Sequence, residues 1–282
     1  VTTLLYLLEE AAKHGKTVWV LDRPNPAGRP VEGTKLLAGY ESFVGAGPMP
    51  MRHGLTMGEM GQWFIRHFGL DVDYRVIAMH HWLPEGPGHG WPESRIWINP
   101  SPNAANVNMA RAYAGTVMIE GATLSEGRGT TRPLEVLFGA PDVEAKAVLA
   151  EMQRVTPDWL AGCALRDCWF EPTFHKHSGQ LCNALMIHAE GIFYDHSAFR
   201  PWRLQASAFK AIRSLYPDYP IWRGTDFKYE YTEGMLAIDV INGGPALREW
   251  VDDPEAGPGD LEALASVDER AWREDVADLL LY

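Results

Sequence analysis

Residues 17–26 read TVWVLDRPNP, and this stretch sets the fold of the first half of the chain. Four apolar residues, VWVL, stand between Thr17 and Asp22, and the β-branched Thr and Val side chains of this run predict a buried strand. The leucines and alanines of residues 4–12 recur with helical spacing and Gly15 follows them, so a helix is expected just before the strand. Pro24 and Pro26 then fix the backbone of the polar loop that follows.

The same alternation continues along the chain. A helix is predicted over residues 56–68 with Thr56 as its N-cap, a strand over 74–79, a helix over 103–115 and a strand over 115–121. This order is typical of an α/β fold with a mainly parallel sheet. Such a unit normally opens with a strand, whereas this chain opens on a helix. We therefore expect the sheet to be incomplete at its N-terminus, with one or more βα units missing upstream.

The pattern changes after the helix expected within residues 139–155. Two strand-like runs follow at 163–174 and 181–191, then a helix at 202–216, a stretch rich in Trp and Tyr, and a terminal helix at 267–282. This order of strands and helices predicts a smaller α+β domain. The expected division is 1–140 for the α/β domain and 141–282 for the second domain.

Composition excludes several classes of partner. The chain has 282 residues, 46% of them hydrophobic, and a formal net charge of −12, with no basic run. Proteins that bind nucleic acid draw affinity from clustered Lys and Arg, so no nucleic-acid partner is expected. No apolar run is long enough to span a membrane. Three cysteines without paired spacing are expected to be buried thiols rather than zinc ligands or disulfides.

Polar loops rich in Pro and Gly follow each of the three predicted strands of the first half, at residues 22–33, 80–94 and 120–133. Ligands of open parallel sheets bind beyond the carboxyl ends of the strands, so these loops are expected to meet at one edge. Gly127 and Gly129 allow the third loop to curl tightly. Asp22, Arg23 and Asn25 are predicted to line the same cleft as residues 125–130, although Asp22 and Arg23 are also a possible pair.

Other polar residues have structural alternatives of comparable weight. Arg52, His53 and Glu59 in MRHGLTMGE suit either a ligand or the start of a helix, and Asn103 suits either a ligand or a helix N-terminus.

No metal site is predicted. His80, His81 and His89, and the strand-like pair His175 and His177, lack carboxylate or cysteine partners at a familiar spacing. GxGxxG, GxxxxGK[ST] and GxSxG motifs are absent, so no cofactor is expected. The remaining chemistry suits a carbohydrate or a ligand that bears a carboxylate.

Several motifs in order carry a resemblance to a known family. They include VLDRPNP, VEG, RHGLT.GE, PSPN, LSEGRGTTRP and PTF.KH.G.LC. The sequence resembles the NamZ-type exo-β-N-acetylmuramidases, formerly DUF1343, from residue 1 to 282. The resemblance implies a Rossmann-like N-terminal domain, a smaller C-terminal domain and a site between them. It also implies a secreted or periplasmic protein that removes terminal N-acetylmuramic acid from peptidoglycan fragments. The saccharide is then the partner of the protein.

The resemblance assigns roles to particular residues. Glu120 and Glu126 are the candidates for carboxylates near the reacting centre, with Arg128 and Arg23 for the lactyl carboxylate of the substrate; Glu126 equally suits a structural pair with Arg128. The substrate-binding candidates are Asp22, Arg23, Asn25, Glu32, Arg52, His53, Asn103, Ser125, Arg128, Thr130 and His177.

The main catalytic glutamate of the family is expected to lie in an upstream Gly-Pro-Glu-His-Gly segment that this chain lacks, because GPGHG at residues 86–90 contains no Glu. Alternatives to a glycosidase are a non-catalytic muropeptide-binding protein and a cell-wall esterase or amidase.

Overall fold

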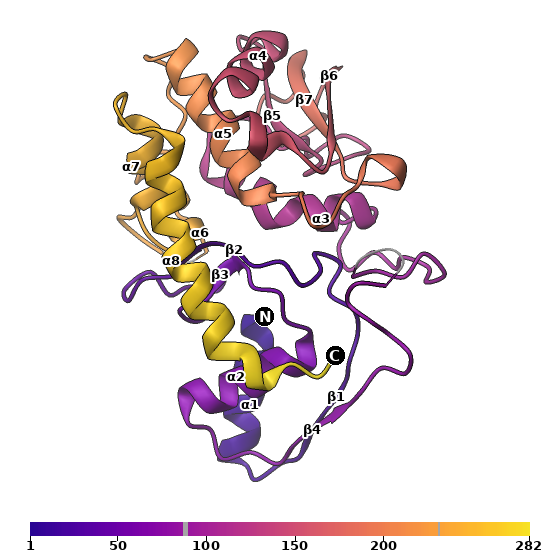
Figure 1. Ribbon diagram of the computed structural model, residues 1–282. Helices are drawn as coiled ribbons and strands as arrows, with labels where there is room; N and C mark the ends of the chain where they lie inside the picture. The colour runs from indigo at the N-terminus through magenta and orange to yellow at the C-terminus, as the bar shows by residue number, and fades with distance from the viewer. Residues whose placement is uncertain (87–89, 231) are drawn as a thin grey trace.

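The computed structural model describes residues 1–86, 90–230 and 232–282 and shows a mixed α/β fold with two hydrophobic cores (Figure 1). The first part of the chain forms α1 (Thr2–Lys13), β1 (Val18–Leu21), β2 (Glu32–Lys35), β3 (Pro50–Arg52), α2 (Met57–Phe68), β4 (Tyr74–Ile77), α3 (Val107–Thr116) and the 3₁₀-helix η1 (Val117–Gly121). The remainder forms β5 (Val136–Ala140), α4 (Ala145–Val155), η2 (Pro157–Leu160), β6 (Ala164–Phe170), β7 (Cys182–His188), η3 (Gly191–Phe193), α5 (Pro201–Leu215), α6 (Ala237–Asn242), α7 (Ala246–Asp252), α8 (Pro258–Val276) and η4 (Ala277–Leu279). None of the described helices combines the length and the apolar composition that crossing a bilayer requires.

The strand, helix and strand predicted at the start of the chain are confirmed. β1 and β4 are parallel neighbours, with α2 on the connection between them. Thr56 accepts a hydrogen bond from the Glu59 amide, and the Glu59 side chain accepts one from the Thr56 amide, so a capping box begins α2. One difference is that β1 is not buried on both faces, since Trp19 and Leu21 are 56% and 62% exposed.

The strand predicted at residues 115–121 is wrong. α3 runs directly into η1, in which Val117, Met118 and Ile119 are all buried. A short apolar run suits a buried helical turn as well as a strand, and here the helical turn prevails. Among the described residues, the parallel sheet therefore contains only β1 and β4, and the β2–β3 and β5–β7–β6 sheets are antiparallel. The loop at residues 122–135 leaves a 3₁₀-helix, not a strand.

The second core is built on the antiparallel β5–β7–β6 sheet, against which α4 and α5 pack. β6 and β7 are the two strands predicted at residues 163–174 and 181–191. β5 was not predicted. It ends at residue 140 and pairs with β7, so the predicted division between domains lies between two strands of one sheet.

α8 joins the two cores and begins at Pro258, nine residues before the predicted terminal helix. Leu261 and Ala265 pack in the core of the antiparallel sheet, whereas Trp272 and Val276 pack with α1 and α2. Figure 1 shows this helix, in yellow, running from one part of the molecule to the other.

A buried ion cluster lies where β2, α5 and α8 meet. Arg203 on α5, with a side chain only 3% exposed, donates to Glu269 at 2.7 Å and to both oxygens of Glu262 at 2.7 and 3.0 Å. Glu32 on β2 accepts hydrogen bonds from the amides of Arg203 and Trp202 at 2.8 and 3.3 Å. These amides belong to the first turn of α5, where a carboxylate also interacts favourably with the helix dipole.

Replacing Arg203 should destabilise the protein strongly, because Glu32 and Glu269 would stay buried without their cation. We expect Arg203→Met to lower the free energy of unfolding by about 3–5 kcal/mol, measured by urea denaturation. The control is Arg154→Met, which removes an exposed arginine that pairs with Glu151 within α4 and should change stability little. Similar losses in both variants would contradict a special role for the cluster.

Candidate functional site

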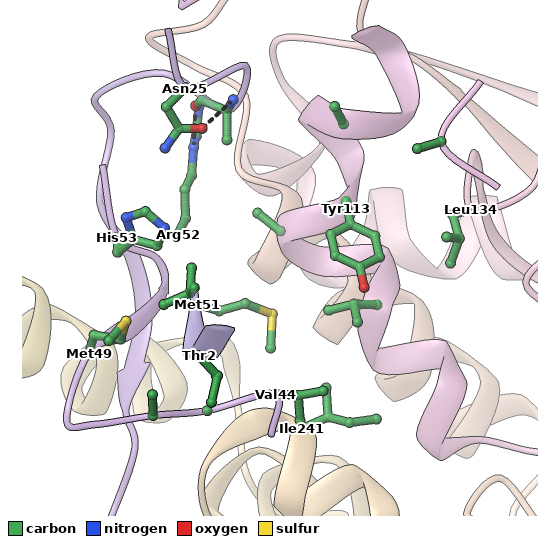
Figure 2. A pocket seen from close by; sticks show the side chains of 18 of the residues that line it. Thr2, Asn25, Val44, Met49, Met51, Arg52, His53, Tyr113, Leu134 and Ile241 are labelled. Carbon is green, nitrogen blue, oxygen red and sulfur yellow. Dashed lines mark hydrogen bonds between the residues drawn. The ribbon is translucent and has the colours of Figure 1, made fainter. Parts of the chain in front are cut away.

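A cavity of about 630 Å³ lies between α3 and the loops that surround β2 and β3 (Figure 2). One wall comes from residues 25–27 and 43–53, and the opposite wall from α3 and Leu134. Figure 2 shows Asn25, His53 and Met51 facing Tyr113 and Leu134 across this space, with Ile241 below. The cavity therefore collects residues from segments that are far apart in the sequence.

The lining is largely apolar, with a few polar groups between the apolar ones. Its aliphatic, thioether and aromatic residues include Leu36, Phe43, Val44, Met49, Met51, Trp97, Met109, Leu134 and Ile241. Its polar side chains include Asn25, His53, Asn103, Tyr113 and Arg128. No carboxylate belongs to the part of the lining that the structure describes. Small-molecule sites commonly combine apolar walls with a few convergent polar groups in this way.

Asn25 and Arg52 fix the first wall. The Asn25 amide donates to the Leu55 carbonyl at 3.0 Å, and its oxygen accepts from the Ala27 amide at 2.9 Å. Arg52 is buried and donates to the carbonyls of Ala27 and Phe199, the latter at 2.7 Å. The guanidinium thus ties the proline-rich loop to the second part of the molecule.

His53 is a neutral side chain on the same wall. Burial lowers the pKa of His53 to about 4, so the ring carries no charge near neutral pH. Its Nδ1 accepts a hydrogen bond from the Leu55 amide at 3.0 Å. Because Nδ1 is the acceptor in a neutral ring, the proton is on Nε2, which can act as a donor.

Arg128 is, with Arg52, a cationic member of the lining and is held between two carboxylates. Its Nε donates to Glu126 at 2.9 Å and its Nη2 donates to Glu120. The other oxygen of Glu120 accepts the Tyr229 hydroxyl at 2.8 Å. Nη1 makes no hydrogen bond to the described residues, and the side chain is 22% exposed. The two carboxylates therefore orient the guanidinium and leave one edge of it open.

Glu126 is completely buried among positively charged or protonatable groups. It lies 3.0 Å from Lys176 Nζ and 3.1 Å from His175 Nδ1. Burial opposes ionisation of Glu126, but the charge and hydrogen bond of Lys176, a backbone hydrogen bond and the proximity of His175 together outweigh it, and the pKa of the carboxyl lies below its usual value. Lys176 also donates to the carbonyls of Ile119 and Leu124 at 2.7 and 3.0 Å. Glu126 is thus an ionised anchor of this loop and not a reservoir of protons at neutral pH.

Ser125 and Thr130 shape the loop rather than the cavity. The Ser125 hydroxyl accepts from the Gly127 amide at 3.1 Å, and the Thr130 hydroxyl donates to the Gly127 carbonyl at 2.6 Å. Gly127 and Gly129 adopt positive φ, as predicted. A Cβ on Gly129 would lie 2.7 Å from the Thr173 amide nitrogen, so the close approach of these two loops requires glycine.

Asp22 and Arg23 lie outside the cavity lining. Asp22 is buried and accepts from the Gly58 amide, the Thr56 hydroxyl and the Tyr282 hydroxyl, at 2.9, 2.6 and 3.0 Å, so it caps the start of α2. The Arg23 side chain is exposed and donates to the carbonyls of Leu21 and Asp22. Of the two loops predicted to share a cleft, Asn25 and Arg128 are the members that line the same cavity.

The other candidates divide between the cavity and structural contacts. Asn103 lines the cavity, and Asn106, not Asn103, is the N-cap of α3. Glu32 caps α5, as described above. Glu59 is buried and pairs with Arg29. Glu120 lies behind Arg128 and is not part of the lining.

The paired histidines differ from their predicted geometry. His175 and His177 follow the end of β6 and both have positive φ, so they do not lie on one face of a strand. His177 Nε2 is buried and has no hydrogen-bond partner in the described part of the chain. No three His, Cys, Asp or Glu side chains among the described residues are placed to hold a metal ion, and His89 lies outside those residues.

Sequence reasoning missed three residues of this site. Tyr113 lines the cavity, Tyr229 contacts Glu120, and Lys176 contacts Glu126. Lys176 stands in the sequence between His175 and His177, which were considered for metal binding. A single lysine between them was the one local sign that this segment pairs with a carboxylate. Nothing local distinguishes Tyr113 or Tyr229 from the many other aromatic residues of the chain.

Two family models match the chain. The model described as "Exo-beta-N-acetylmuramidase NamZ, N-terminal" matches residues 1–108, and "Exo-beta-N-acetylmuramidase NamZ, C-terminal" matches residues 111–282. Peptidoglycan beta-N-acetylmuramidase NamZ of Bacillus subtilis (strain 168) is 36% identical over 244 residues, which cover 86% of this chain and 56% of the relative. The chain thus spans little more than half the length of this curated relative.

Two solved structures share the fold. Both are DUF1343 family proteins from Bacteroides fragilis NCTC 9343. The first has a TM-score of 0.80 at 24% identity and is matched over 98% of this chain and 68% of its own. The second has a TM-score of 0.72 at 21% identity, over 99% and 70%. At these identities the similarity supports the architecture alone.

The lowered pKa of Glu126 predicts how stability depends on pH. A carboxyl whose pKa is lower in the folded state stabilises the protein above its unfolded pKa, and this contribution is lost as pH falls through the folded value. Glu126→Gln should therefore be less stable than the wild type at pH 7, with a gap that narrows below about pH 5. Urea denaturation at a series of pH values measures both curves. The exposed Glu255→Gln is the control and should follow the wild type; a gap independent of pH would contradict an ionised Glu126.

Proposed function

The chain belongs to the NamZ family of exo-β-N-acetylmuramidases, and we propose that the protein is a glycoside hydrolase that releases terminal, non-reducing N-acetylmuramic acid from peptidoglycan fragments. The name of the Bacillus subtilis relative supports this choice of substrate. Because peptidoglycan lies outside the cytoplasm, we also propose a secreted or periplasmic location. The parallel β1–α2–β4 unit supports a Rossmann-like arrangement of the first part.

The observation that carries the proposal is the cavity between α3 and the loops of the first part. Its volume of about 630 Å³ falls within the range of small-molecule sites. Met51 and Leu134 offer apolar surface to the carbon faces and methyl groups of an N-acetyl sugar. Asn25 and Asn103 offer amides to its hydroxyl groups. The cavity thus suits one or two sugar rings.

Arg128 supports an acidic sugar in particular. N-acetylmuramic acid differs from N-acetylglucosamine by a lactyl group that ends in a carboxylate. A guanidinium matches a carboxylate in shape and charge, and Nη1 of Arg128 is the donor that Glu120 and Glu126 leave open. We therefore place the lactyl group at the Arg128 side of the cavity.

Glycoside hydrolysis needs a carboxylic acid that protonates the leaving oxygen and a second group that attacks the anomeric carbon or activates the nucleophile that does so. Glu126 does not fit the first role, because Lys176 holds it ionised. Glu120 has a side chain that is 16% exposed, but it is already hydrogen-bonded by Arg128 and Tyr229. We propose that the proton donor is a carboxyl group other than Glu126, and that Glu126 acts by holding Arg128.

The proposed activity is tested by incubating the full-length protein with the disaccharide MurNAc-GlcNAc and measuring free N-acetylmuramic acid by mass spectrometry. We expect the free sugar to appear, and 4-nitrophenol to be released from 4-nitrophenyl N-acetylmuramide. Binding of the disaccharide without turnover would indicate a non-catalytic muropeptide-binding protein. Release of acetate with an intact glycosidic bond would indicate an esterase or amidase.

Arg128→Lys should weaken the discrimination between the two sugars. Lysine keeps the charge but loses the planar fork, so kcat/KM on the N-acetylmuramide should fall by about 10- to 100-fold. The residual rate on the N-acetylglucosaminide analogue should fall much less. Arg154→Lys, on the exposed face of α4, serves as the matched control and should leave both rates unchanged. Equal losses on both sugars in Arg128→Lys would rule out contact with the lactyl carboxylate.

A further inference from the structure

Tyr113 lines the cavity, and its hydroxyl has no hydrogen-bond partner among the described residues. It lies on α3, and Figure 2 shows its ring projecting toward the space opposite Met51. The residue is 41% exposed although it lines the cavity. Its hydroxyl makes no hydrogen bond to the described residues, whereas Tyr229, which also lies near Glu120, uses its hydroxyl to bind that carboxylate. A phenol that faces a cavity without a partner is available to a ligand.

The charges of Arg128 and Glu120 both act on the hydroxyl of Tyr113. Partial burial of the ring raises the pKa of Tyr113 to about 12, with a further contribution from the charge of Glu120 and an opposing one from Arg128. The phenol therefore keeps its proton at neutral pH and acts as a donor. The two oxygens of Glu120 receive hydrogen bonds from Arg128 and Tyr229, whereas no hydrogen bond joins Tyr113 to Glu120 among the described residues.

We propose that the hydroxyl of Tyr113 and the open Nη1 edge of Arg128 form one subsite, which binds the carboxylate of an acidic sugar from two directions. This subsite deepens the proposed function and rests on it. Glu120 and Glu126 are positioning residues of the subsite, since they hold the guanidinium while Lys176 neutralises the second carboxylate. Tyr113 is then a residue that determines specificity for the acid over the neutral sugar.

The charges around Arg128 explain why a second donor is needed. Glu120 and Glu126 contact two cationic side chains, Arg128 and Lys176, so the charges within these four side chains offset one another. Because Glu120 and Glu126 already pair with Arg128, a carboxylate that approaches this guanidinium gains less from charge than it would at an unpaired arginine, and directed hydrogen bonds contribute more of its binding. A neutral hydroxyl donor adds such a bond without adding charge, and a hydrogen bond to an ionised group is stronger than one between neutral groups.

The test compares N-acetylmuramic acid with N-acetylglucosamine as ligands of the full-length protein, by isothermal titration calorimetry. Tyr113→Phe keeps the ring and removes only the hydroxyl. We expect it to weaken binding of N-acetylmuramic acid about tenfold or more and to leave N-acetylglucosamine within about twofold. Tyr6→Phe is the control, because it is an exposed tyrosine outside the lining and keeps its ring contact with Phe43. Thermal unfolding of both variants verifies that they fold.

A double-mutant cycle with Arg128→Lys adds an independent criterion. If both side chains grip one carboxylate, their losses in affinity for N-acetylmuramic acid should not be additive. Equal effects of Tyr113→Phe on the two sugars, no effect on the acid, or strictly additive losses would overturn the subsite. These results leave the proposed function standing as long as the wild type releases N-acetylmuramic acid. If the wild type neither binds nor releases that sugar, both the function and the subsite are wrong.

Discussion

The contact of Arg203 with Glu32 and Glu269 is the interaction on which the rest of the structure depends. It brings together one residue from β2, one from α5 and one from α8, elements that belong to different packing units. Two elements joined only by apolar contacts can shift along each other at little cost. A buried cation between two carboxylates keeps its hydrogen bonds in only one arrangement of the elements that carry them. Arg52 then adds a second tie, from β3 to the Phe199 carbonyl just before α5. These contacts connect β3, which forms part of one wall of the cavity, to α5, which packs against α3 on the other wall.

The second set of buried charges serves the site directly. Lys176, Glu126, Arg128 and Glu120 follow one another in contact and end at the Tyr229 hydroxyl. In every member except Arg128, the charged or polar atoms are paired with other groups of the protein. Such a chain is costly to desolvate, but it fixes the direction of its last free donor. The glycine-rich loop at residues 125–133 therefore contains so many polar side chains because most of them hold one another, and few are left for a ligand.

The local parts of the fold were predictable from the sequence, and the long-range parts were not. α1, α2 and β1 follow from hydrophobic spacing and from the Thr56 cap, which are signals within a dozen residues. Residues 115–121 were misread as a strand, and β5 was not predicted, because short apolar runs do not reveal whether they become strand or helix. Asp22 and Glu32 were assigned to a ligand, but each caps a helix whose first turn lies far along the chain. The Glu126–Lys176 pair spans fifty positions, and no spacing rule indicates it.

The distribution of charge separates binding from proton transfer in this site. In the described lining of the cavity, the charged side chains are the guanidinium groups of Arg52 and Arg128, and His53, Tyr113 and the asparagine amides supply further donors. Carboxylates stand behind Arg128, in contact with cations that keep Glu126 ionised. A surface of this kind is complementary to a ligand rich in acceptors, such as the carboxylate, acetamido carbonyl and hydroxyl oxygens of an acidic amino sugar. A carboxylate within this lining would accept hydrogen bonds from these donors and make them unavailable to such a ligand.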